Sequence, residues 1–397
     1  MSTSGARIVL LPGREASVLR RHPWVMSGAV SRVDGDAAAG DLVRVLAADG
    51  TTLGHGHYAP QSQLRVRMLA FGDEACSEAV IAERLRSAIA ARAAHPLLAD
   101  TNALRLVNAE GDGLPGLVVD RFADVIVVRA GSAAWLERSS AVADVLREAT
   151  GARAALARPD AAALRREGAH AEPRTLWGEP PSEPVALDER GRRYLADVAH
   201  GQKTGFYLDQ RDARDLVQRI AAGRRVLDLF SYTGGFALAA LAGGAAHVTL
   251  VDSSRDALAL ARRNLQGLGG AAEARAELTE TDGFEYARKH ARGFELAIAD
   301  PPPLARRKAD VPRAARAHKD LLLHLFREAP PAASVLAFSC SHHIGPELFR
   351  KIAFGAALDA GRDARVTAEL GAPADHPVSL FHPEGRYLTG LLLELRG

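Results

Sequence analysis

Residues 226–235 read Val-Leu-Asp-Leu-Phe-Ser-Tyr-Thr-Gly-Gly, and this stretch decides the fold. Its apolar residues surround a single acid, Asp228, which is the pattern of a buried parallel strand. The pair Gly234-Gly235 predicts a turn in which the backbone approaches a ligand closely, because glycine has no side chain and tolerates positive φ. A helix should follow this turn at once.

The residues after the turn predict a βαβ unit. An Ala-rich helix over 236–241 ends at Gly243-Gly244, and a second strand over 247–252 ends in Asp252. A carboxylate about 20 residues beyond such a turn can accept hydrogen bonds from both ribose hydroxyls of a nucleoside. The turn departs from G-x-G-x-x-G and no Lys-Ser/Thr follows, which disfavours a pyrophosphate. S-adenosylmethionine (SAM) is the best candidate ligand; the alternative is a doubly wound α/β domain with an acid at a strand end by chance.

The length of 397 residues predicts two or three domains with sizeable cores. A hydrophobic content of 47% with 25% charged residues is typical of a soluble globular protein. Two cysteines, Cys76 and Cys340, are too few for a disulfide scaffold or a structural zinc cluster, and they indicate a reducing cytoplasm. We find no secretory signal and no apolar run of about 18 residues, so we expect no membrane association. A net charge of +2 leaves nucleic-acid binding open.

Residues 1–74 contain short apolar runs separated by turn residues, which predicts a small β-barrel or sandwich. Asp49-Gly50 is a hairpin signal. Arg65 and Arg67 alternate with apolar residues, and we interpret them as a solvated strand edge. The expected strands cover 7–11, 41–46, 53–58 and 64–69.

Residues 75–185 predict a middle α+β domain. A helix capped by Ser77 opens it, and a linker rich in Pro, Glu and Ser at 178–184 closes it. Acids among glycines are interpreted as turn formers rather than metal ligands: Glu110, Asp112 and Asp120. The other expected elements are strands at 104–107, 117–121, 124–129 and 154–156 and a helix at 134–150.

Residues 186–397 hold the βαβ unit and predict a third domain. Two β-type runs between 193 and 208 flank the loop 201–205, and a helix over 209–220 leads toward the first strand of the unit. Polar groups beside aromatic residues in 206–212 could form one wall of a nucleoside site. A hairpin followed by a capped helix would show the same pattern.

The strand 294–300 ends in Asp300 and runs directly into Pro301-Pro302-Pro303. Proline fixes φ and removes backbone donors, so it should hold this carboxylate in one orientation at the edge where ligands bind. At that edge the acid could form hydrogen bonds with the edge of a planar base. Prolines that simply end a strand would give the same sequence pattern. Asp282 lies where another strand would end, in an Asp-Gly pair that is also a common turn.

The strand 334–340 delivers Cys340 to the same edge of the sheet. Polar neighbours could stabilise its thiolate, whereas a buried core cysteine is the simpler alternative. Together with Asp300, this cysteine suggests methylation at carbon 5 of a pyrimidine. Thiolate addition at carbon 6 makes carbon 5 nucleophilic, and an acid near nitrogen 3 offsets the charge that develops. The polar neighbours are Ser339, Ser341, His342 and His343.

A basic segment separates these two strands. A solvated helix face is the default interpretation, but the position beside Asp300 favours contact with the phosphates of a polynucleotide. In the C-terminal region, the proline neighbours of His376, His382 and Glu384 predict a rigid loop over the sheet edge, to which we assign no metal. The basic residues are Arg306, Arg307, Lys308, Arg313, Arg316, Lys319 and Arg327.

Taken in order, the motifs resemble the bacterial large-subunit rRNA cytosine-5 methyltransferase I family over essentially the whole chain. His22-Pro-Trp24 with 62–67 looks like its N-terminal PUA domain, and 105–107 with 112–116 looks like its middle domain. The most specific motifs are Gly201-Gln-Lys-Thr-Gly-Phe-Tyr-Leu-Asp-Gln-Arg211, Phe230-Ser-Tyr-Thr-Gly-Gly235, Asp300-Pro-Pro302, Phe338-Ser-Cys-Ser341, Asp375-His-Pro377 and Pro383-Glu-Gly-Arg-Tyr-Leu388.

The resemblance implies a class I, Rossmann-like SAM methyltransferase domain with a mixed, mostly parallel seven-stranded sheet, preceded by a PUA β-barrel and a middle domain. It implies that Cys340 is the nucleophile of a cytoplasmic enzyme, in which the chemistry given above makes Asp300 the second catalytic residue. The partner would be 23S rRNA or a precursor of the large ribosomal subunit, and a homodimer is allowed. The expected SAM-binding residues are Phe206, Phe230, Ser231, Thr233, Asp252, Asp282 and Asp300. The expected RNA-binding residues are Lys203, Arg306, Arg307 and Lys308.

The chain departs from the family at 303–308, which read Pro-Leu-Ala-Arg-Arg-Lys where relatives usually carry a polar residue and then an aromatic. This leaves the exact nucleotide open. Another group of 5-methylcytosine enzymes uses a second cysteine, after a proline in the region that corresponds to Asp300, to release the product, and no cysteine directly follows Asp300-Pro301-Pro302 here. The base that removes the carbon 5 proton is therefore unassigned, with His342 and His343 as suggestions. Two alternatives remain: methylation of a purine nitrogen with a structural Cys340, and a non-catalytic RNA-binding protein that keeps the SAM site.

Overall fold

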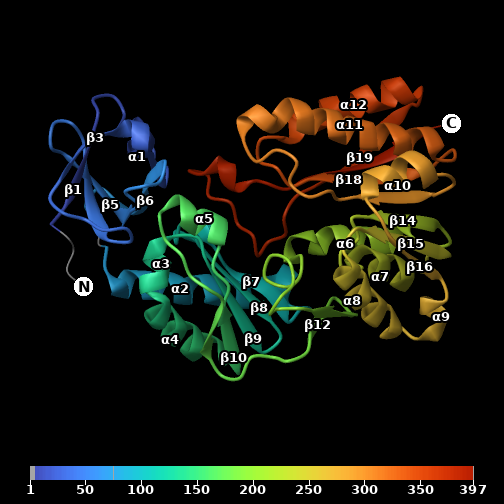
Figure 1. The fold of residues 1–397 in the computed structure, drawn as a ribbon, viewed down its shortest axis with the longest axis horizontal. Helices are drawn as coiled ribbons and strands as arrows, with labels where there is room; N and C mark the ends of the chain where they lie inside the picture. Colours follow the sequence, from blue (N-terminus) through green and yellow to red (C-terminus); the bar gives the residue numbers. More distant parts are fainter. Residues whose placement is uncertain (1–4, 75, 397) are drawn as a thin grey trace. The chain divides into compact units, whose positions relative to one another are not determined.

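The computed structural model describes residues 5–74 and 76–396. The described chain forms two compact units (Figure 1). The predicted division into three domains at residues 74 and 185 stays a prediction. The first unit comprises residues up to 187 with 196–205 and 374–385, and the second comprises 188–195, 206–373 and the residues from 386 onward.

The first unit begins with a six-stranded sheet in the order β2-β6-β5-β4-β1-β3. All of its neighbouring pairs are antiparallel except β1 with β4, and apolar side chains from these strands form one core. The hairpin predicted at Asp49-Gly50 is confirmed between β4 and β5. The strands are β1 (Arg7–Leu10), β2 (Trp24–Met26), β3 (Val30–Asp34), β4 (Leu42–Leu46), β5 (Thr52–Tyr58) and β6 (Leu64–Phe71), with α1 (Ala16–Leu19) and the 3-10 turn η1 (Ser27–Ala29) between β1 and β3.

Two expectations for this sheet are wrong. The sequence missed β2 and β3, because β2 has three residues and the side chains of β3 are mostly exposed, so neither shows an apolar alternation. Arg67 is not on a solvated edge, because β6 lies between β2 and β5. Its side chain is buried and pairs with Glu167, which no local pattern indicates.

A five-stranded sheet follows in the order β11-β10-β9-β8-β7. The Ser77 cap of α2 is confirmed, because its Oγ accepts a hydrogen bond from the Val80 amide at 3.3 Å. The helix expected over 134–150 is two helices that meet at Arg138. The elements are α2 (Glu78–Ala93), η2 (Pro96–Leu98), β7 (Ala103–Asn108), η3 (Ala109–Asp112), β8 (Leu117–Phe122), β9 (Val125–Ala130), α3 (Ala133–Glu137), α4 (Ser139–Thr150), β10 (Ala154–Ala157), α5 (Ala161–Arg166) and β11 (Arg174–Trp177).

The acids interpreted as turn formers mainly serve as partners of buried or half-buried side chains. Arg92 donates to both carboxylate oxygens of Asp112 at 2.7 Å, and Arg105 donates to Asp120 at 2.8 and 3.0 Å. These bonds tie α2 and β7 to the residues that follow them in the chain.

The second unit is organised around a seven-stranded sheet, and the mixed, mostly parallel sheet that we expected is confirmed. Its order is β16-β15-β14-β17-β18-β20-β19, with β20 antiparallel to both of its neighbours. The chain runs outward from β14 on both sides, so the ends of β14 and β17 mark the switch point at which such sheets bind ligands. The strands are β14 (Arg225–Leu229), β15 (His247–Asp252), β16 (Ala276–Glu280), β17 (Leu296–Ala299), β18 (Ser334–Ser339), β19 (Ala364–Leu370) and β20 (Thr389–Leu395).

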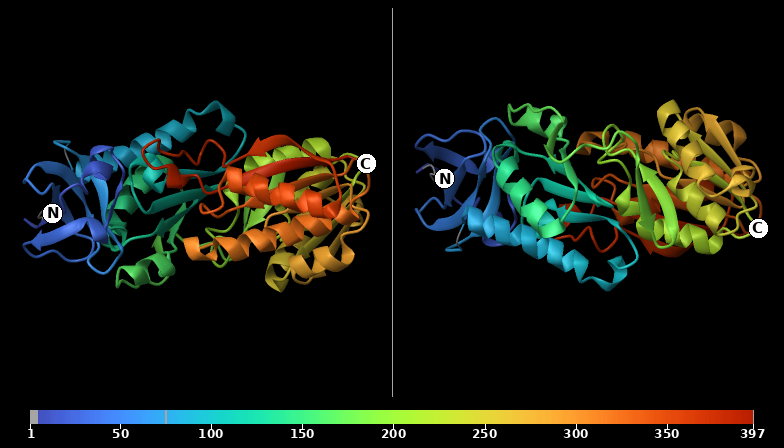
Figure 2. Two further views of the ribbon diagram at one scale, coloured as in Figure 1. Left: turned by 90° about the horizontal axis from the view of Figure 1, so that it is seen from above. Right: turned by 90° about the horizontal axis from the view of Figure 1, so that it is seen from below.

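Helices cover both faces of this sheet (Figure 1). The views in Figure 2 show α11 and α12 in front on one side and α7 and α8 in front on the other. On the first side, α10, α11 and α12 pack against the strands in one apolar core. No helix among the described residues is long and apolar enough to cross a membrane. The helices are α6 (Arg211–Ile220), α7 (Gly235–Ala242), α8 (Arg255–Gln266), α9 (Gly270–Glu273), α10 (Gly283–His290), α11 (Val311–Glu328) and α12 (Pro346–Ala360).

The segment that leads into this unit differs in part from the expectation. Strands β12 (Val185–Glu189) and β13 (Arg192–Ala196) pair with each other, so a strand before the loop 201–205 is confirmed. The second β-type run is wrong, because the residues after the loop form a turn and the 3-10 helix η4 (Leu208–Gln210) that leads into α6. Two further 3-10 turns are η5 (Lys308–Asp310) and η6 (Pro383–Gly385).

Candidate active site

The loop after β14 is a tight turn at the carboxyl edge of the seven-stranded sheet. Phe230 and Tyr232 adopt left-handed backbone conformations with φ of 60° and 48°, and Gly234 has φ of 80°. The Gly234 amide donates to the Ser231 carbonyl at 2.8 Å, which closes the turn. Helix α7 begins directly at Gly235, so the predicted strand, turn and helix are confirmed.

Asp252 ends β15 beside this turn. Its Oδ2 accepts a hydrogen bond from the Tyr232 amide at 2.8 Å, and its Oδ1 accepts one from the Ser254 amide at 2.8 Å. The two hydrogen bonds hold the half-buried carboxylate at the carboxyl end of β15. In such folds an acid at this position accepts hydrogen bonds from the ribose hydroxyls of a nucleoside.

Three buried side-chain oxygens around the turn have no hydrogen-bond partner among the described residues. They are Asp228 Oδ1, Ser231 Oγ and Thr233 Oγ1. Buried polar atoms in proteins are normally paired, so these atoms suit a polar ligand at this turn. Asp228 is held in place because its Oδ2 accepts from the Ala237 amide in the first turn of α7, at 3.1 Å.

The charge at this edge favours a positively charged ligand. Burial raises the pKa of Asp228 well above its usual range, and Asp300 and Asp252 raise it further against the lowering effect of the Ala237 amide. Like charges that share a site disfavour ionisation, and a nearby cation reverses this effect. SAM carries a sulfonium and an ammonium group, so its charge and its polar atoms fit the residues present.

Phe230, which follows β14, packs against the two residues after Asp282. The Phe230 ring lies 5.1 Å from the ring of Phe284, and a Cβ on Gly283 would lie only 2.7 Å from the Phe230 ring. Only glycine therefore allows this approach. Asp282 is exposed and caps α10, accepting from the Glu285 amide at 2.9 Å. Both residues are at the predicted edge, while their contacts with a cofactor stay predictions.

Phe206 is buried beneath the glycine turn. A Cβ on Gly235 would lie 3.6 Å from its ring, and the Tyr194 ring centroid is 5.1 Å away. The Arg214 guanidinium covers the Phe206 ring at 4.6 Å. In this position Phe206 supports the turn, and its direct contact with a cofactor stays a prediction.

A buried ionic cluster holds the segment between β13 and α6. Arg214 donates to Glu189 through Nε at 2.8 Å and to the Tyr207 carbonyl through Nη1 at 2.8 Å. Burial raises the pKa of Glu189, but Arg214, Arg211 and Arg192 outweigh this effect and hold it below its usual value. The sequence did not indicate this cluster, because its members share no local spacing.

Asp300 and Cys340 follow the carboxyl ends of two neighbouring strands, as the sequence predicted. Strands β17 and β18 are parallel, with Ala299 opposite Ala337. The Cys340 Sγ donates to the Pro301 carbonyl at 3.5 Å. The half-buried thiol therefore contacts the backbone that carries Asp300.

Gln210 is a site residue that the sequence did not single out. Its Nε2 donates to Asp300 Oδ2 at 2.9 Å, and its side chain is only 3% exposed. The signal that could have found it is the concentration of polar groups beside aromatics in 206–212, which had suggested one wall of the site.

Tyr207 is a second such residue. Burial raises its pKa above the usual range, and surrounding acidic groups raise it further, so its phenol keeps its proton at neutral pH. Its ring meets Tyr232 edge to face at 5.3 Å. The groups that raise the pKa of Tyr207 are Asp300, Asp209, Tyr232 and Cys340.

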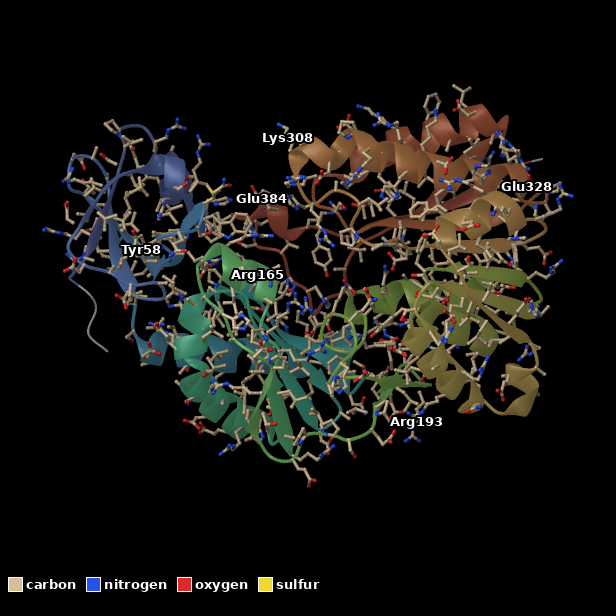
Figure 3. The ribbon with its side chains drawn as sticks, in the orientation of Figure 1. Tyr58, Arg165, Arg193, Lys308, Glu328 and Glu384 are labelled. Atoms are coloured by element: carbon tan, nitrogen blue, oxygen red, sulfur yellow. The ribbon has the colours of Figure 1, made fainter. Side chains whose placement is uncertain are left out.

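The basic residues at 306–308 are exposed in the segment between β17 and α11. Figure 3 labels Lys308 near one end of α11 and Glu328 at the other. The Ala305 amide donates to Ser341 Oγ at 3.3 Å, which ties the start of this segment to the residue after the cysteine. The fourth predicted RNA-binding residue, Lys203, lies in the first unit and has a left-handed φ of 52°.

The predicted rigid loop in the C-terminal region is held by buried contacts of the first unit. Asp375 Oδ2 accepts from the Arg105 amide at 2.9 Å, and Asp375 Oδ1 lies 3.0 Å from His376 Nδ1. Asn108 Nδ2 donates to the Pro377 carbonyl at 2.9 Å. His376 is thus engaged by its neighbour.

Known proteins share this architecture and sequence. The family of SAM-dependent methyltransferases matches residues 113–360, and the PUA-like domain family matches residues 8–71. A candidate SAM-dependent methyltransferase from Streptococcus mutans has a TM-score of 0.80 at 21% identity, covering 98% of this chain and 99% of that one. A second structure, of a candidate methyltransferase with S-adenosylhomocysteine bound, has a TM-score of 0.83 at 21% identity and the same coverage. At this low sequence identity, the two structures show that the chain has the fold of these proteins.

Curated relatives are closer in sequence. Ribosomal RNA large subunit methyltransferase I of Klebsiella pneumoniae is 39% identical over 97% of both chains. The protein of that name from Aeromonas salmonicida is 39% identical over 98% of this chain and 99% of its own. The chain therefore belongs to the family of SAM-dependent methyltransferases that includes ribosomal RNA large subunit methyltransferase I.

Proposed function

We propose that this protein uses SAM to form 5-methylcytosine in 23S rRNA through a covalent adduct of Cys340. The observation that carries the proposal is the placement of the Cys340 thiol beside the Asp300-Pro301 backbone, at the ends of adjacent parallel strands. The substrate class is taken from the relatives, whose names give the large-subunit ribosomal RNA as their substrate. The cytosine rests on the chemistry of a thiol paired with an acid.

In this mechanism the protein makes carbon 5 of cytosine nucleophilic. The Cys340 thiolate adds to carbon 6, and the electron pair of the 5,6 double bond moves toward nitrogen 3, where the proton of a neutral Asp300 carboxyl would offset the developing negative charge. Bound SAM would supply the electrophilic methyl group that carbon 5 takes, and its methyl–sulfur bond would break so that S-adenosylhomocysteine leaves. A base then takes the carbon 5 proton, the electron pair of that carbon–hydrogen bond restores the 5,6 double bond, and the bond between carbon 6 and sulfur breaks to release Cys340 as a thiolate. His342 and His343 lie two and three residues after Cys340 in the sequence and are our candidates for this base.

The contacts of the protein with SAM and with RNA phosphates are also proposals. The residues that would hold SAM are Phe206, Phe230, Ser231, Thr233, Asp252, Asp282 and Asp300. Those that would contact RNA phosphates are Lys203, Arg306, Arg307 and Lys308, together with the PUA-like domain. A cytoplasmic location and a homodimer also stay predictions.

Replacement of the nucleophile tests the proposal. Cys340→Ala and Cys340→Ser should reduce 5-methylcytosine in 23S rRNA to background when each variant complements cells that lack the gene, measured by mass-spectrometric mapping. The matched control is Cys76→Ala, because burial raises the pKa of Cys76 to about 11 and makes it a poor nucleophile. Near-normal 5-methylcytosine in Cys340→Ala cells would exclude the covalent route.

Two further measurements separate the alternatives. RNA that carries 5-fluorocytosine should trap a covalent complex with the unchanged protein and not with Cys340→Ala, because fluorine cannot leave as a proton does. A methylated purine in place of 5-methylcytosine, retained in Cys340→Ala cells, would support purine-nitrogen methylation. Absence of SAM binding to the folded protein in calorimetry would support a non-catalytic RNA-binding protein.

A further inference from the structure

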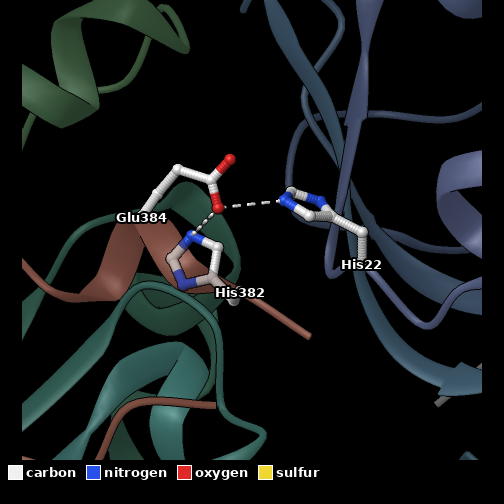
Figure 4. A group of neighbouring side chains, drawn as sticks. All are labelled: His22, His382 and Glu384. Atoms are coloured by element: carbon white, nitrogen blue, oxygen red, sulfur yellow. Dashed lines mark hydrogen bonds and ion pairs between the residues drawn. The ribbon is translucent and has the colours of Figure 1, made fainter. Parts of the chain in front are cut away.

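Two histidines and a glutamate meet in the first unit, whereas the residues of the candidate active site around Asp300 and Cys340 belong to the second. Figure 4 shows the carboxylate of Glu384 between the rings of His22 and His382. Glu384 Oε2 lies 3.3 Å from His22 Nε2 and 3.9 Å from His382 Nε2. One potential ligand atom from each residue lies within 4.8 Å of the other two.

The His382 ring is packed against Trp24, but its Nε2 atom forms no hydrogen bond with the described residues. His382 is 3% exposed, and its Nε2 is buried without a hydrogen-bond partner among the described residues. The Trp24 indole packs on the His382 ring at 4.4 Å and is itself fixed, because its Nε1 donates to Glu110 Oε1 at 2.9 Å. A buried histidine nitrogen aimed at a carboxylate without a hydrogen bond is unusual in a protein interior.

We propose, against the expectation from the sequence that His382 and Glu384 hold no metal, that these two residues and His22 bind a divalent transition-metal ion of the zinc class. Two imidazole nitrogens and one carboxylate oxygen are a donor set that zinc uses with a fourth position left for water. Ligand atoms at about 2.0–2.1 Å from a tetrahedral zinc ion lie roughly 3.3 Å apart. The His22–Glu384 separation matches this value, and small movements of the exposed Glu384 side chain bring the third ligand into range.

One hydrogen bond must be exchanged when the ion binds. The Trp24 amide donates to His22 Nδ1 at 3.1 Å, so in the metal-free protein the proton of the neutral ring sits on Nε2 and points at Glu384. The ion displaces this proton, Nδ1 becomes the protonated nitrogen, and the Trp24 contact is lost. The new bond to His382, whose nitrogen gains a partner, offsets that loss.

The ion would join two parts of the chain that are 362 residues apart. Trp24 begins β2 of the N-terminal sheet and His22 lies two residues before it, whereas Glu384 lies in η6 and His382 directly precedes η6. Both parts belong to the first unit. We therefore assign the ion a structural role: it fixes the 382–384 turn on the N-terminal sheet.

Zinc binding to the untagged, chelator-treated full-length protein tests this inference. We expect about one zinc ion per chain to be retained in equilibrium dialysis. Glu384→Gln and His22→Gln should weaken retention by more than the roughly 10- to 100-fold that loss of an outer partner of a metal ligand costs. The matched control is His170→Gln, because His170 forms a similar but exposed pair with Glu172 at 2.8 Å.

Two readouts report the site itself. Zinc should change the fluorescence of Trp24 and raise the unfolding temperature of the unchanged protein and of His170→Gln, but not of Glu384→Gln. Cobalt should give the visible absorption bands of a four-coordinate ion in the same two proteins. The Glu384 side chain is 41% exposed, so its variant should fold. The proposal is overturned if the unchanged protein retains no zinc, or if folded Glu384→Gln and His22→Gln retain zinc as tightly as His170→Gln.

Discussion

The Gln210 side chain donates a hydrogen bond from Nε2 to Asp300 Oδ2 at 2.9 Å, across 90 residues of sequence. Gln210 is buried and ends η4, while Asp300 follows β17 at the switch point of the sheet. The amide thus fixes the orientation of the carboxylate that we propose to act on the base. We regard Gln210 as a positioning residue.

Gln210→Ala should lower kcat by roughly 100-fold, because misplacement of a catalytic group by about 1 Å can cost that much. The affinity for SAM should change little. Single-turnover methylation of rRNA with calorimetry of SAM binding measures both quantities. The control is Gln266→Ala, since the exposed Gln266 side chain donates a long hydrogen bond of 3.5 Å to Glu273. Equal losses in kcat and SAM affinity would contradict a positioning role.

Glu189→Gln should destabilise the protein by about 3–5 kcal/mol, because it leaves buried guanidinium groups without their counter-charge. The pKa of Glu189 in the folded protein is held below its usual value of 4.5. Its stabilisation is therefore present above pH 4.5 and is lost as the pH falls through the folded pKa. Urea unfolding at neutral and acidic pH measures the effect. Exposed Glu277, which lies 3.8 Å from His247, provides the control variant Glu277→Gln.

Local patterns predicted several elements correctly, although not the turn and 3-10 helix that hold Phe206 and Gln210. Strand β15 occupies the residues 247–252 that its apolar run indicated, and Ser77 caps α2 as its position before an amphipathic segment suggested. Asp300 and Cys340 could be placed at one edge because each follows the carboxyl end of a buried strand. In these cases the signal lies within a few residues of the chain.

The contacts that refine the site could not be predicted in this way. Gln210 meets Asp300, Arg67 meets Glu167 and His22 meets Glu384 only after strands distant in sequence have packed. The sequence shows the residue types but carries no spacing that joins them. The exposed strand β3 was missed for a related reason, because its pairing with β1 depends on backbone bonds rather than on apolar side chains.

His57 should make the first unit less stable in mild acid. Burial lowers its pKa well below the usual value of 6.5, and Arg138 and Arg67 lower it further, so it is neutral in the folded protein. The unfolded chain binds a proton as the pH falls below 6.5, and stability should decline by at most about 1.4 kcal/mol per pH unit. His57→Leu keeps apolar packing against Trp135 and should flatten this dependence in denaturant titrations, unlike His170→Gln. An unchanged slope would assign the acid sensitivity to another group.

SAM binding should strengthen as the pH rises through the raised pKa of Asp228. The buried acid is neutral below that pKa and ionises above it, and only the ionised form attracts the positive charge of SAM, so affinity should rise by at most about tenfold per pH unit. Asp228→Asn keeps an acceptor for the Ala237 amide but carries no charge at any pH. At alkaline pH this variant should therefore bind SAM more weakly than the unchanged protein, and its affinity for SAM should change little with pH. Calorimetric titration from mildly acidic to mildly alkaline pH measures this, with exposed Asp256→Asn as the control. If the SAM affinity of Asp228→Asn kept the full pH dependence, the titrating group would have to be another acid at this edge of the sheet. Asp252 would be the next residue to replace, although its two oxygens already accept amide hydrogen bonds.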